Sequence, residues 1–177
     1  MSTLFVDTIN EQTTGNGIQI PGHMVQFQSD RSTTRIATNS GTFQDTGIEI
    51  SFTPKFSNSK LLITYDVSVN IPEYGFSGSS SRFLARIYNS TDSSVIGPAG
   101  GTNLWRFDIQ PSSVGINGIY AYSHPAVQHV EDSWGTSAKT IKIQIAQGDN
   151  TGSAGIVFNE TYPSGQDSGV TIMEIAQ

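Results

Sequence analysis

The sequence contains no cysteine, which excludes disulfide bonds and thiolate metal sites. Charge is also scarce: 14% of the 177 residues are Asp, Glu, Lys or Arg, against about 25% in an average soluble domain. The nine Lys and Arg are scattered, and the net charge is −6. Because binding a nucleic-acid backbone requires clustered cations, nucleic acid is not an expected partner.

Long apolar runs are missing as well. No stretch of about 18 consecutive apolar residues occurs, so we expect no transmembrane helix and no membrane insertion. Residues 1–7 lack the basic and apolar regions of a signal peptide, and the expectation that follows is synthesis in a host cytoplasm.

Catalytic signatures are absent too. The sequence has neither a Gly-x-Ser-x-Gly nucleophile elbow nor a Gly-x-x-x-x-Gly-Lys phosphate loop. Glu131 and Asp132 could supply one carboxylate of a glycoside-cleaving pair, but nothing in the sequence identifies the second. We therefore predict no catalytic residues, no enzyme activity and no cofactor.

Metal-binding patterns are equally weak. The histidines at 23, 124 and 129 lack the spacing of a helical zinc pair, and exposed loop histidines are the simpler interpretation. The segments 89–92 and 148–151 carry the oxygen ligands that calcium prefers, but Asp and Asn are equally expected in turns. No residue is assigned to a metal.

What the sequence does contain is a period-2 alternation of apolar and polar residues, typical of half-buried antiparallel strands. Strands are predicted at 47–53, 60–70, 82–89, 93–96, 103–109, 118–123, 139–147, 154–160 and 169–176. Turn-rich segments separate them. Eight or nine strands separated by turns predict an all-β protein, an antiparallel β-sandwich of jelly-roll or Greek-key type.

Residues 1–40 differ from the rest in having only sparse, short apolar runs, with a further strand expected at 24–28. Such strands cannot form a core alone, so they must pack on the main domain, a sister subunit or a different protein. We divide the chain into an extended attachment and oligomerisation segment, 1–40, and a sandwich domain, 41–177. The predicted attachment residues are Leu4, Phe5, Val6, Ile18 and Ile20.

Two further interpretations concern the second half of the chain. Between Pro125 and Trp134 the spacing of the apolar residues allows a short helix, with an ordered loop as the alternative. Trp134, Tyr120 and Tyr122 are candidates for a binding surface, because exposed aromatic rings hold sugars or protein partners. Filling the core or a subunit interface is the alternative role for these rings.

Three parts of the chain resemble virion fibre proteins of bacteriophages, in particular phages that infect cyanobacteria. The first is LFVDTINE at 4–11 with GNGIQIPGHMVQ at 15–26. The second, TGIEISFTPK at 46–55 with SNSKLLI at 57–63, resembles the first hairpin of their jelly-roll-like module. The third, GVTIMEIAQ at 169–177, resembles the closing strand. The resemblance implies a homotrimeric β-rich protein exposed on a virion, with other virion proteins as partners.

The function expected from these observations is that of a non-enzymatic virion structural protein. Long tail fibres carry an extended N-terminal anchor that this chain lacks, so we expect a short trimeric tail fibre or a tail or baseplate component. A host cell-surface glycan or protein is a further candidate partner. The main alternative is a capsid decoration protein, and the less expected ones are a glycan-binding module and a polysaccharide depolymerase.

Overall fold

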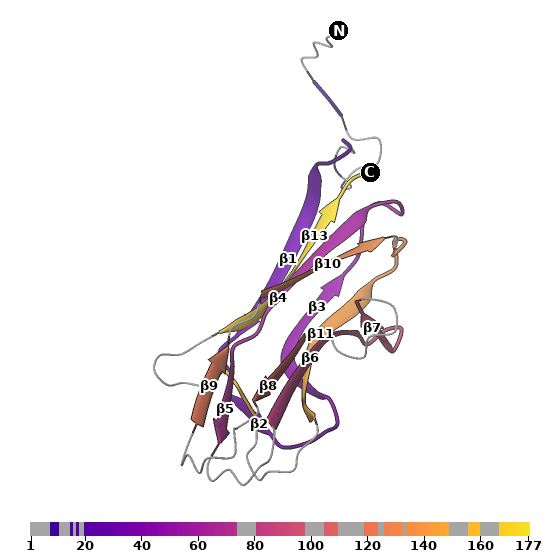
Figure 1. The fold of residues 1–177 in the computed structure, drawn as a ribbon. Helices are drawn as coiled ribbons and strands as arrows, with labels where there is room; N and C mark the ends of the chain where they lie inside the picture. The colour runs from indigo at the N-terminus through magenta and orange to yellow at the C-terminus, as the bar shows by residue number, and fades with distance from the viewer. Residues whose placement is uncertain are drawn as a thin grey trace.

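The computed structural model describes residues 8–10, 15, 17, 20–73, 81–97, 105–109, 119–123, 126–132, 134–148, 156–159 and 167–177. Within these residues the chain forms strands and no helix (Figure 1). The strands are β1 (Met24–Ser32), β2 (Ile36–Thr38), β3 (Gln44–Phe52), β4 (Lys60–Asp66), β5 (Val69–Glu73), β6 (Ser81–Asn89), β7 (Ser94–Ile96), β8 (Trp105–Ile109), β9 (Ile119–Ser123), β10 (Ala126–Asp132), β11 (Lys139–Gly148), β12 (Ile156–Phe158) and β13 (Ser168–Ile175).

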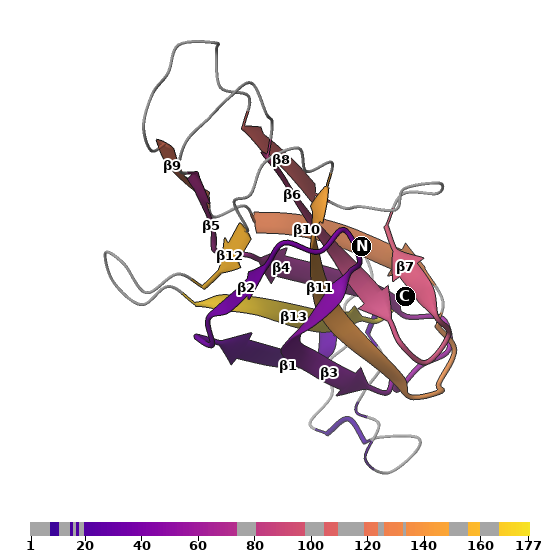
Figure 2. The same ribbon diagram turned by 90° about the horizontal axis from the view of Figure 1, so that it is seen from below.

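The strands pair antiparallel in three sheets. Sheet I has the order β1-β13-β4-β10, and Figure 2 shows these four strands side by side. Sheet II has the order β3-β11-β6-β7, with β8 also paired to β6. Sheet III has the order β2-β12-β5-β9 and continues sheet I, because each of its strands directly precedes or follows the corresponding strand of sheet I in the chain. Sheets I and III thus form one bent layer, and sheet II forms the other.

The connectivity of the described strands is that of a jelly roll. If each continued strand counts once, the chain forms eight units: β1/β2, β3, β4/β5, β6, β7/β8, β9/β10, β11 and β12/β13. The first unit pairs with the eighth, the second with the seventh, the third with the sixth and the fourth with the fifth. This nested pairing is the double Greek key that defines the fold. The predicted all-β antiparallel sandwich is confirmed.

The core lies between the two layers and follows the alternation seen in the sequence. Buried residues occupy every second position of β3 and of β4, as expected for strands with one face in the core; the residues between them are exposed in β3 and mostly half-buried in β4. The largest fully buried side chains are Tyr65, Phe52, Phe83, Phe158, Ile48, Leu61, Ile63, Ile87, Ile141, Ile143 and Ile145. The outward-facing residues of both layers are therefore left to solvent or to partners.

The segment between Pro125 and Trp134 is neither a helix nor a loop, and both sequence-based interpretations were wrong. Residues 126–132 form strand β10, which pairs with β4 along its whole length. Exposed and half-buried residues alternate along it, and Val127 packs against the core while Val130 faces outward. Pairing with β4 satisfies the backbone of this segment, which outweighs the helix-like spacing of its two valines.

Part of the N-terminal segment belongs to the sandwich sheets. The sequence division fell at residue 40, yet β1 pairs with β13 from Met24 to Ser32, and β2 pairs with β12. Two backbone hydrogen bonds extend the first pairing, from Gly22 N to Ala176 O (2.8 Å) and from Ala176 N to His23 O (2.9 Å). Residues 22–38 thus pack on the main domain, one of the alternatives left open by the sequence.

Candidate assembly surface

One row of apolar side chains crosses the outer face of sheet I. Phe27 of β1 lies opposite Met173 of β13, Met173 lies opposite Leu62 of β4, and Leu62 lies opposite Val130 of β10. The neighbouring residues Ile63 and Ile172 point into the core, so the row points outward. Phe27 is 59% exposed and Val130 is 53% exposed, and the two central side chains are half-buried.

A second apolar pair extends the row toward the end of the sheet. Met24, which is 56% exposed, lies opposite Ile175 on the same face. We call the six residues of the row and this pair the apolar face: Met24, Phe27, Leu62, Val130, Met173 and Ile175. The next row on the same outer face, on the side away from Met24 and Ile175, is polar. It consists of Ser29, Thr171, Thr64 and Gln128.

The apolar face is unusual for a sheet that faces water. An antiparallel sheet with one solvated face normally carries polar residues there. Contiguous exposed apolar side chains rimmed by polar ones mark interaction sites more often than isolated ones do. The row also spans the sheet from edge to edge, since β1 and β10 are its outer strands (Figure 2). The arrangement can bind another apolar surface but carries no group that could act in catalysis.

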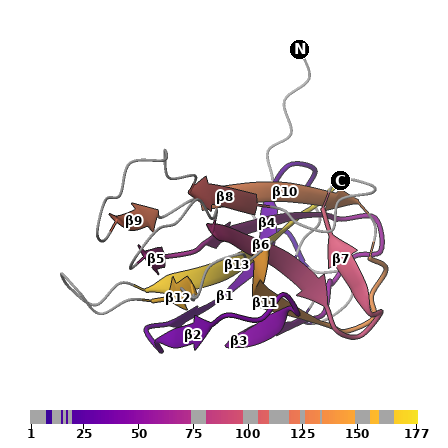
Figure 3. The ribbon, with the colours of Figure 1, turned by 60° about the horizontal axis from the view of Figure 1, so that its bottom comes forward.

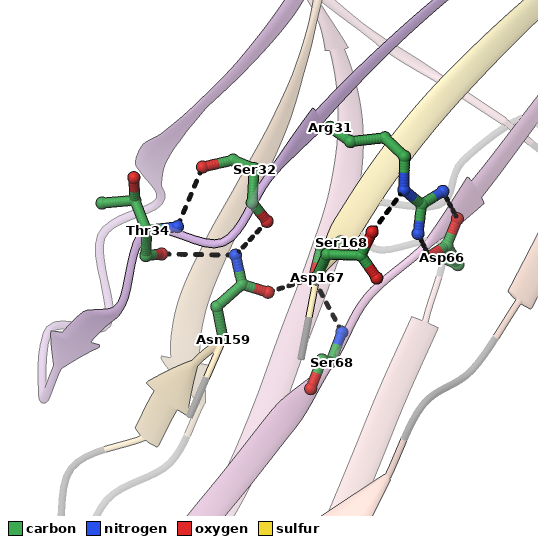
Figure 4. Close-up of polar contacts among 8 residues, drawn as sticks. All are labelled: Arg31, Ser32, Thr34, Asp66, Ser68, Asn159, Asp167 and Ser168. Atoms are coloured by element: carbon green, nitrogen blue, oxygen red, sulfur yellow. Dashed lines mark hydrogen bonds and ion pairs between the residues drawn. The ribbon is translucent and has the colours of Figure 1, made fainter. Parts of the chain in front are cut away.

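A buried polar joint holds the bend between sheets I and III (Figure 4). Asn159 Nδ2 donates to the carbonyl oxygens of Ser32 (2.7 Å) and Thr34 (3.2 Å), and its Oδ1 accepts from Ser168 Oγ (2.6 Å). Ser168 Oγ in turn accepts from the backbone N–H of Ser68 (2.8 Å). Asn159 adopts a left-handed conformation with φ of 53°, which Asn tolerates better than most residues. Each of these side chains is used in holding strands, so the joint is structural.

An ion-pair cluster lies beside this joint on the surface. The Arg31 guanidinium binds Asp66 with an N–O distance of 2.8 Å and Asp167 with one of 2.7 Å. Hydrogen bonds from Arg31 to Asp167 and then Asp66 raise the pKa of the arginine further above its ordinary value. The cluster ties β1 to β4 and to the residue preceding β13, and all three side chains are partly exposed.

Glu174 is a fully buried carboxylate that anchors the loop between β3 and β4. Its oxygens accept hydrogen bonds from Ser59 Oγ (2.6 Å), Gln26 Nε2 (2.7 Å) and the backbone N–H groups of Lys55 and Phe56 (2.9 Å each). Burial alone would raise the pKa of Glu174, but these hydrogen bonds outweigh it and lower the pKa. With its donors all supplied by the fold, this carboxylate is structural too.

The predicted site residues are dispersed. Trp134 is half-buried, and its ring meets the core residue Phe52 edge-on, with 6.3 Å between the ring centroids. Tyr120 and Tyr122 lie on β9, opposite Pro72 and Asn70, and their side chains lie outside the described part. Of the predicted attachment residues, Ile20 is 39% exposed. The others, Leu4, Phe5, Val6 and Ile18, lie outside the described residues.

Sequence reasoning missed the apolar face. Its members Phe27 and Val130 lie in segments for which the sequence predicts a short extra strand and a helix or loop, respectively. The signal that could have found them is alternation: Val130 follows Gln128 in the outward-facing series of β10. The row itself could not be found without the register of all four strands.

His129 was expected in a loop, but it lies in β10, where its Nε2 is 2.9 Å from Glu131 Oε2. In the described part of the chain no three His, Asp or Glu side chains are grouped to hold a metal ion. None of the described segments is a helix that could cross a membrane.

Comparisons with known proteins give no family. No protein-family model matches the chain, and no curated protein matches it. Among solved structures, the chain is similar to "Structure of Eiger TNF from S. frugiperda", with a TM-score of 0.37 and 9% sequence identity. That alignment covers 85% of this chain and 94% of the other.

Proposed function

We propose that the protein is a non-enzymatic structural protein that assembles into a homotrimer through the apolar face of sheet I. From the resemblance of its sequence to phage fibre proteins, we further propose that it serves on a bacteriophage virion as a short tail fibre or a tail or baseplate component. The observation that carries the first proposal is the exposed row from Phe27 to Val130.

The energetics favour a covered row. Burying one large apolar side chain that was exposed is worth about 1.5–3 kcal/mol. Three side chains of the apolar face, Met24, Phe27 and Val130, are each more than half exposed. Phe27 and Val130 lie on opposite edge strands of the sheet. Phe27 and Val130 are already nearly half covered, so a contact that buries both gains roughly 1.5–3 kcal/mol in all. Association costs at least about 4 kcal/mol in lost translational and rotational freedom, so other side chains of the apolar face must be covered as well to offset it.

The position of the exposed side chains favours a ring over a face-to-face pair. Phe27 is carried by edge strand β1 and Val130 by edge strand β10. In a ring, the β1 side of one copy meets the β10 side of the next, so both edges are covered in every copy by one repeated contact. Closure at three copies is the part of the proposal that comes from the sequence resemblance.

The test is the solution mass of the intact chain by light scattering. We expect three times the chain mass of 19.0 kDa. The double variant Phe27→Gln, Val130→Gln should be a folded monomer, because both side chains are already more than half exposed in one copy. The matched control is Ser29→Gln, Gln128→Ser, which changes the polar row on the same two strands. A monomeric wild type, or a double variant that keeps the wild-type mass, would overturn the proposal.

Virions that lack the protein would distinguish a tail location from a capsid location. Removing a tail component should abolish host adsorption while the heads remain intact. Removing a capsid decoration protein should instead lower head stability without changing adsorption, and that result would replace the tail assignment.

A further inference from the structure

The outer face of sheet II contains a guanidinium in an unusual setting. Strand β6 lies beside both β7 and β8 (Figure 3). It pairs with β8 over Ser81–Ala85 and with β7 over Ile87–Asn89, so Arg86 is the position between the two paired stretches. On its other side β6 pairs with β11, where Gln144 lies opposite Arg86. The Arg86 side chain therefore leaves the sheet at the point where the strand paired with β6 changes from β8 to β7.

Aromatic rings and an amide fix the Arg86 side chain. Its Cζ lies 3.9 Å from the centroid of the Phe43 ring and 4.8 Å from that of Tyr88. Its Nε donates to Gln144 Oε1 at 2.8 Å. All four of these residues are at least half-buried, so the guanidinium is held in one place before any ligand arrives.

The nearest acidic side chain is already used by other groups. Asp45 Oδ1 accepts from Gln144 Nε2 (2.6 Å), and Asp45 Oδ2 accepts from Lys142 Nζ (2.7 Å). Among the described residues, the two Nη groups of Arg86 have no hydrogen bond or ion pair. Burial lowers the pKa of Arg86, while Tyr88 and Asp45 act in the opposite direction. Arg86 is therefore a partly desolvated cation whose two Nη groups are available to bind an anion.

We propose that Arg86, held between Phe43 and Tyr88, binds the carboxylate of a sugar acid, that is, a uronic-acid unit of an acidic polysaccharide. The two Nη groups match the two oxygens of a carboxylate. Phe43 and Tyr88 lie against the guanidinium itself, so their part in the site is to hold Arg86 in position for the carboxylate. A singly charged carboxylate fits better than a phosphate dianion, because Asp45 and Glu49 lie on the same face and would repel the larger charge.

This site goes beyond the proposed assembly and does not depend on it, because it lies on the opposite layer from the apolar face. The two proposals can therefore fail separately. A variant that loses the trimer should keep the site, and a variant that loses the site should keep the trimer.

The experiment is calorimetric titration of the full chain with tetragalacturonic acid and with its fully methyl-esterified form, which has the same rings and no charge. We expect the acid to bind and the ester not to bind. Arg86→Gln should lose about tenfold to a hundredfold in affinity, since the hydrogen bonds removed are charge-assisted. Arg86→Lys should retain part of the affinity, because it keeps the charge and loses the fork. Lys60→Gln, which removes an exposed cation from sheet I, is the control and should bind as the wild type does.

Each remaining outcome contradicts the proposal. Equal binding of acid and ester, wild-type affinity in Arg86→Gln, or no binding of the acid at millimolar concentration would show that Arg86 does not recognise a sugar carboxylate. Inorganic phosphate is the last arm. If it binds at Arg86 as tightly as the tetrasaccharide, the site is a general oxyanion site and the saccharide assignment is wrong.

Discussion

Changing Glu174 to Gln removes a buried charge around which four donor groups converge. Ser59 Oγ and the backbone N–H of Phe56 donate to Oε1, Gln26 Nε2 donates to Oε2, and the N–H of Lys55 is shared between both oxygens. Hydrogen bonds to a charged acceptor are worth about 1.5–3 kcal/mol each, against about 0.5–1.5 for neutral ones. Gln keeps the shape but turns every one of these bonds neutral and replaces one acceptor by a donor.

The expected loss is about 2–4 kcal/mol in the free energy of unfolding, since roughly 0.5–1 kcal/mol is lost at each of the four donors. Gln26 cannot recover its bond by reversing its amide, because its Nε2 also donates to Thr53 O (2.8 Å). Such a loss is a large share of the roughly 5–15 kcal/mol that stabilises a typical domain. The assay is urea unfolding at pH 7 and fixed protein concentration. Glu49→Gln, which removes an exposed carboxylate, is the control and should change stability by no more than about 0.5 kcal/mol. Equal losses in the two variants would refute the anchoring role of Glu174.

The pH dependence gives a second test of the same carboxylate. Burial would raise the pKa of Glu174, but the hydrogen bonds from Ser59, Lys55, Phe56 and Gln26 make the net shift a lowering. A lowered pKa in the folded state means that the ionised carboxylate stabilises the fold above its unfolded pKa of about 4.3. That contribution is lost as the pH falls through the lower folded pKa. The stability difference between wild type and Glu174→Gln should be constant above about pH 5 and shrink below about pH 4. A difference that does not change with pH would contradict the assignment.

Three further predictions concern the core, the joint and the N-terminus. Tyr65→Phe should raise the free energy of unfolding by about 1 kcal/mol, because the buried Tyr65 hydroxyl has no hydrogen-bond partner among the described residues; a clear loss in urea unfolding would show that the hydroxyl is bonded. Asn159→Ala should cost about 1 kcal/mol more than Asn159→Gly, since only glycine relieves the positive φ, and both should lose the joint's hydrogen bonds; equal melting temperatures would argue against strain at this position. Deletion of residues 1–20 should leave a cooperative thermal transition, whereas deletion of 1–40 removes β1 and β2 and should abolish it.

Alternation predicted most of the sandwich because it reports burial directly. Ile48, Ile50 and Phe52 are buried at every second position of β3, and the intervening residues are exposed, so the sequence pattern and the strand coincide. The same logic failed for β10. There the two valines at 127 and 130 lie on opposite faces of the strand, and their spacing of three imitates a helix. An apolar residue that faces outward, as Val130 does, breaks the alternation by which strands are recognised.

The bend and the apolar face depend on contacts that no local pattern contains. Residues 60–70 read as one strand, but the structure interrupts it at Val67 and Ser68. The group that holds Ser68 is the hydroxyl of Ser168, one hundred residues later. The row from Phe27 to Val130 likewise draws one residue from each of four strands, and only the sheet register brings them together. Side-chain direction can be read from a sequence, whereas strand register cannot when the partners are far apart in the chain.

The two outer faces of the sandwich differ in a way that joins the two proposals. Sheet I carries the exposed apolar row, whereas sheet II carries the chain of polar contacts through Arg86, Gln144, Asp45 and Lys142. In the proposed trimer, the outer face of sheet I in each copy turns toward the sister copies, and the outer face of sheet II remains on the outside of the trimer. The three Arg86 sites of one trimer could then bind one polysaccharide together. Binding at the first site would raise the effective concentration of the polysaccharide at the other two. The Phe27→Gln, Val130→Gln monomer should therefore keep the affinity for tetragalacturonic acid but lose affinity for the long polymer.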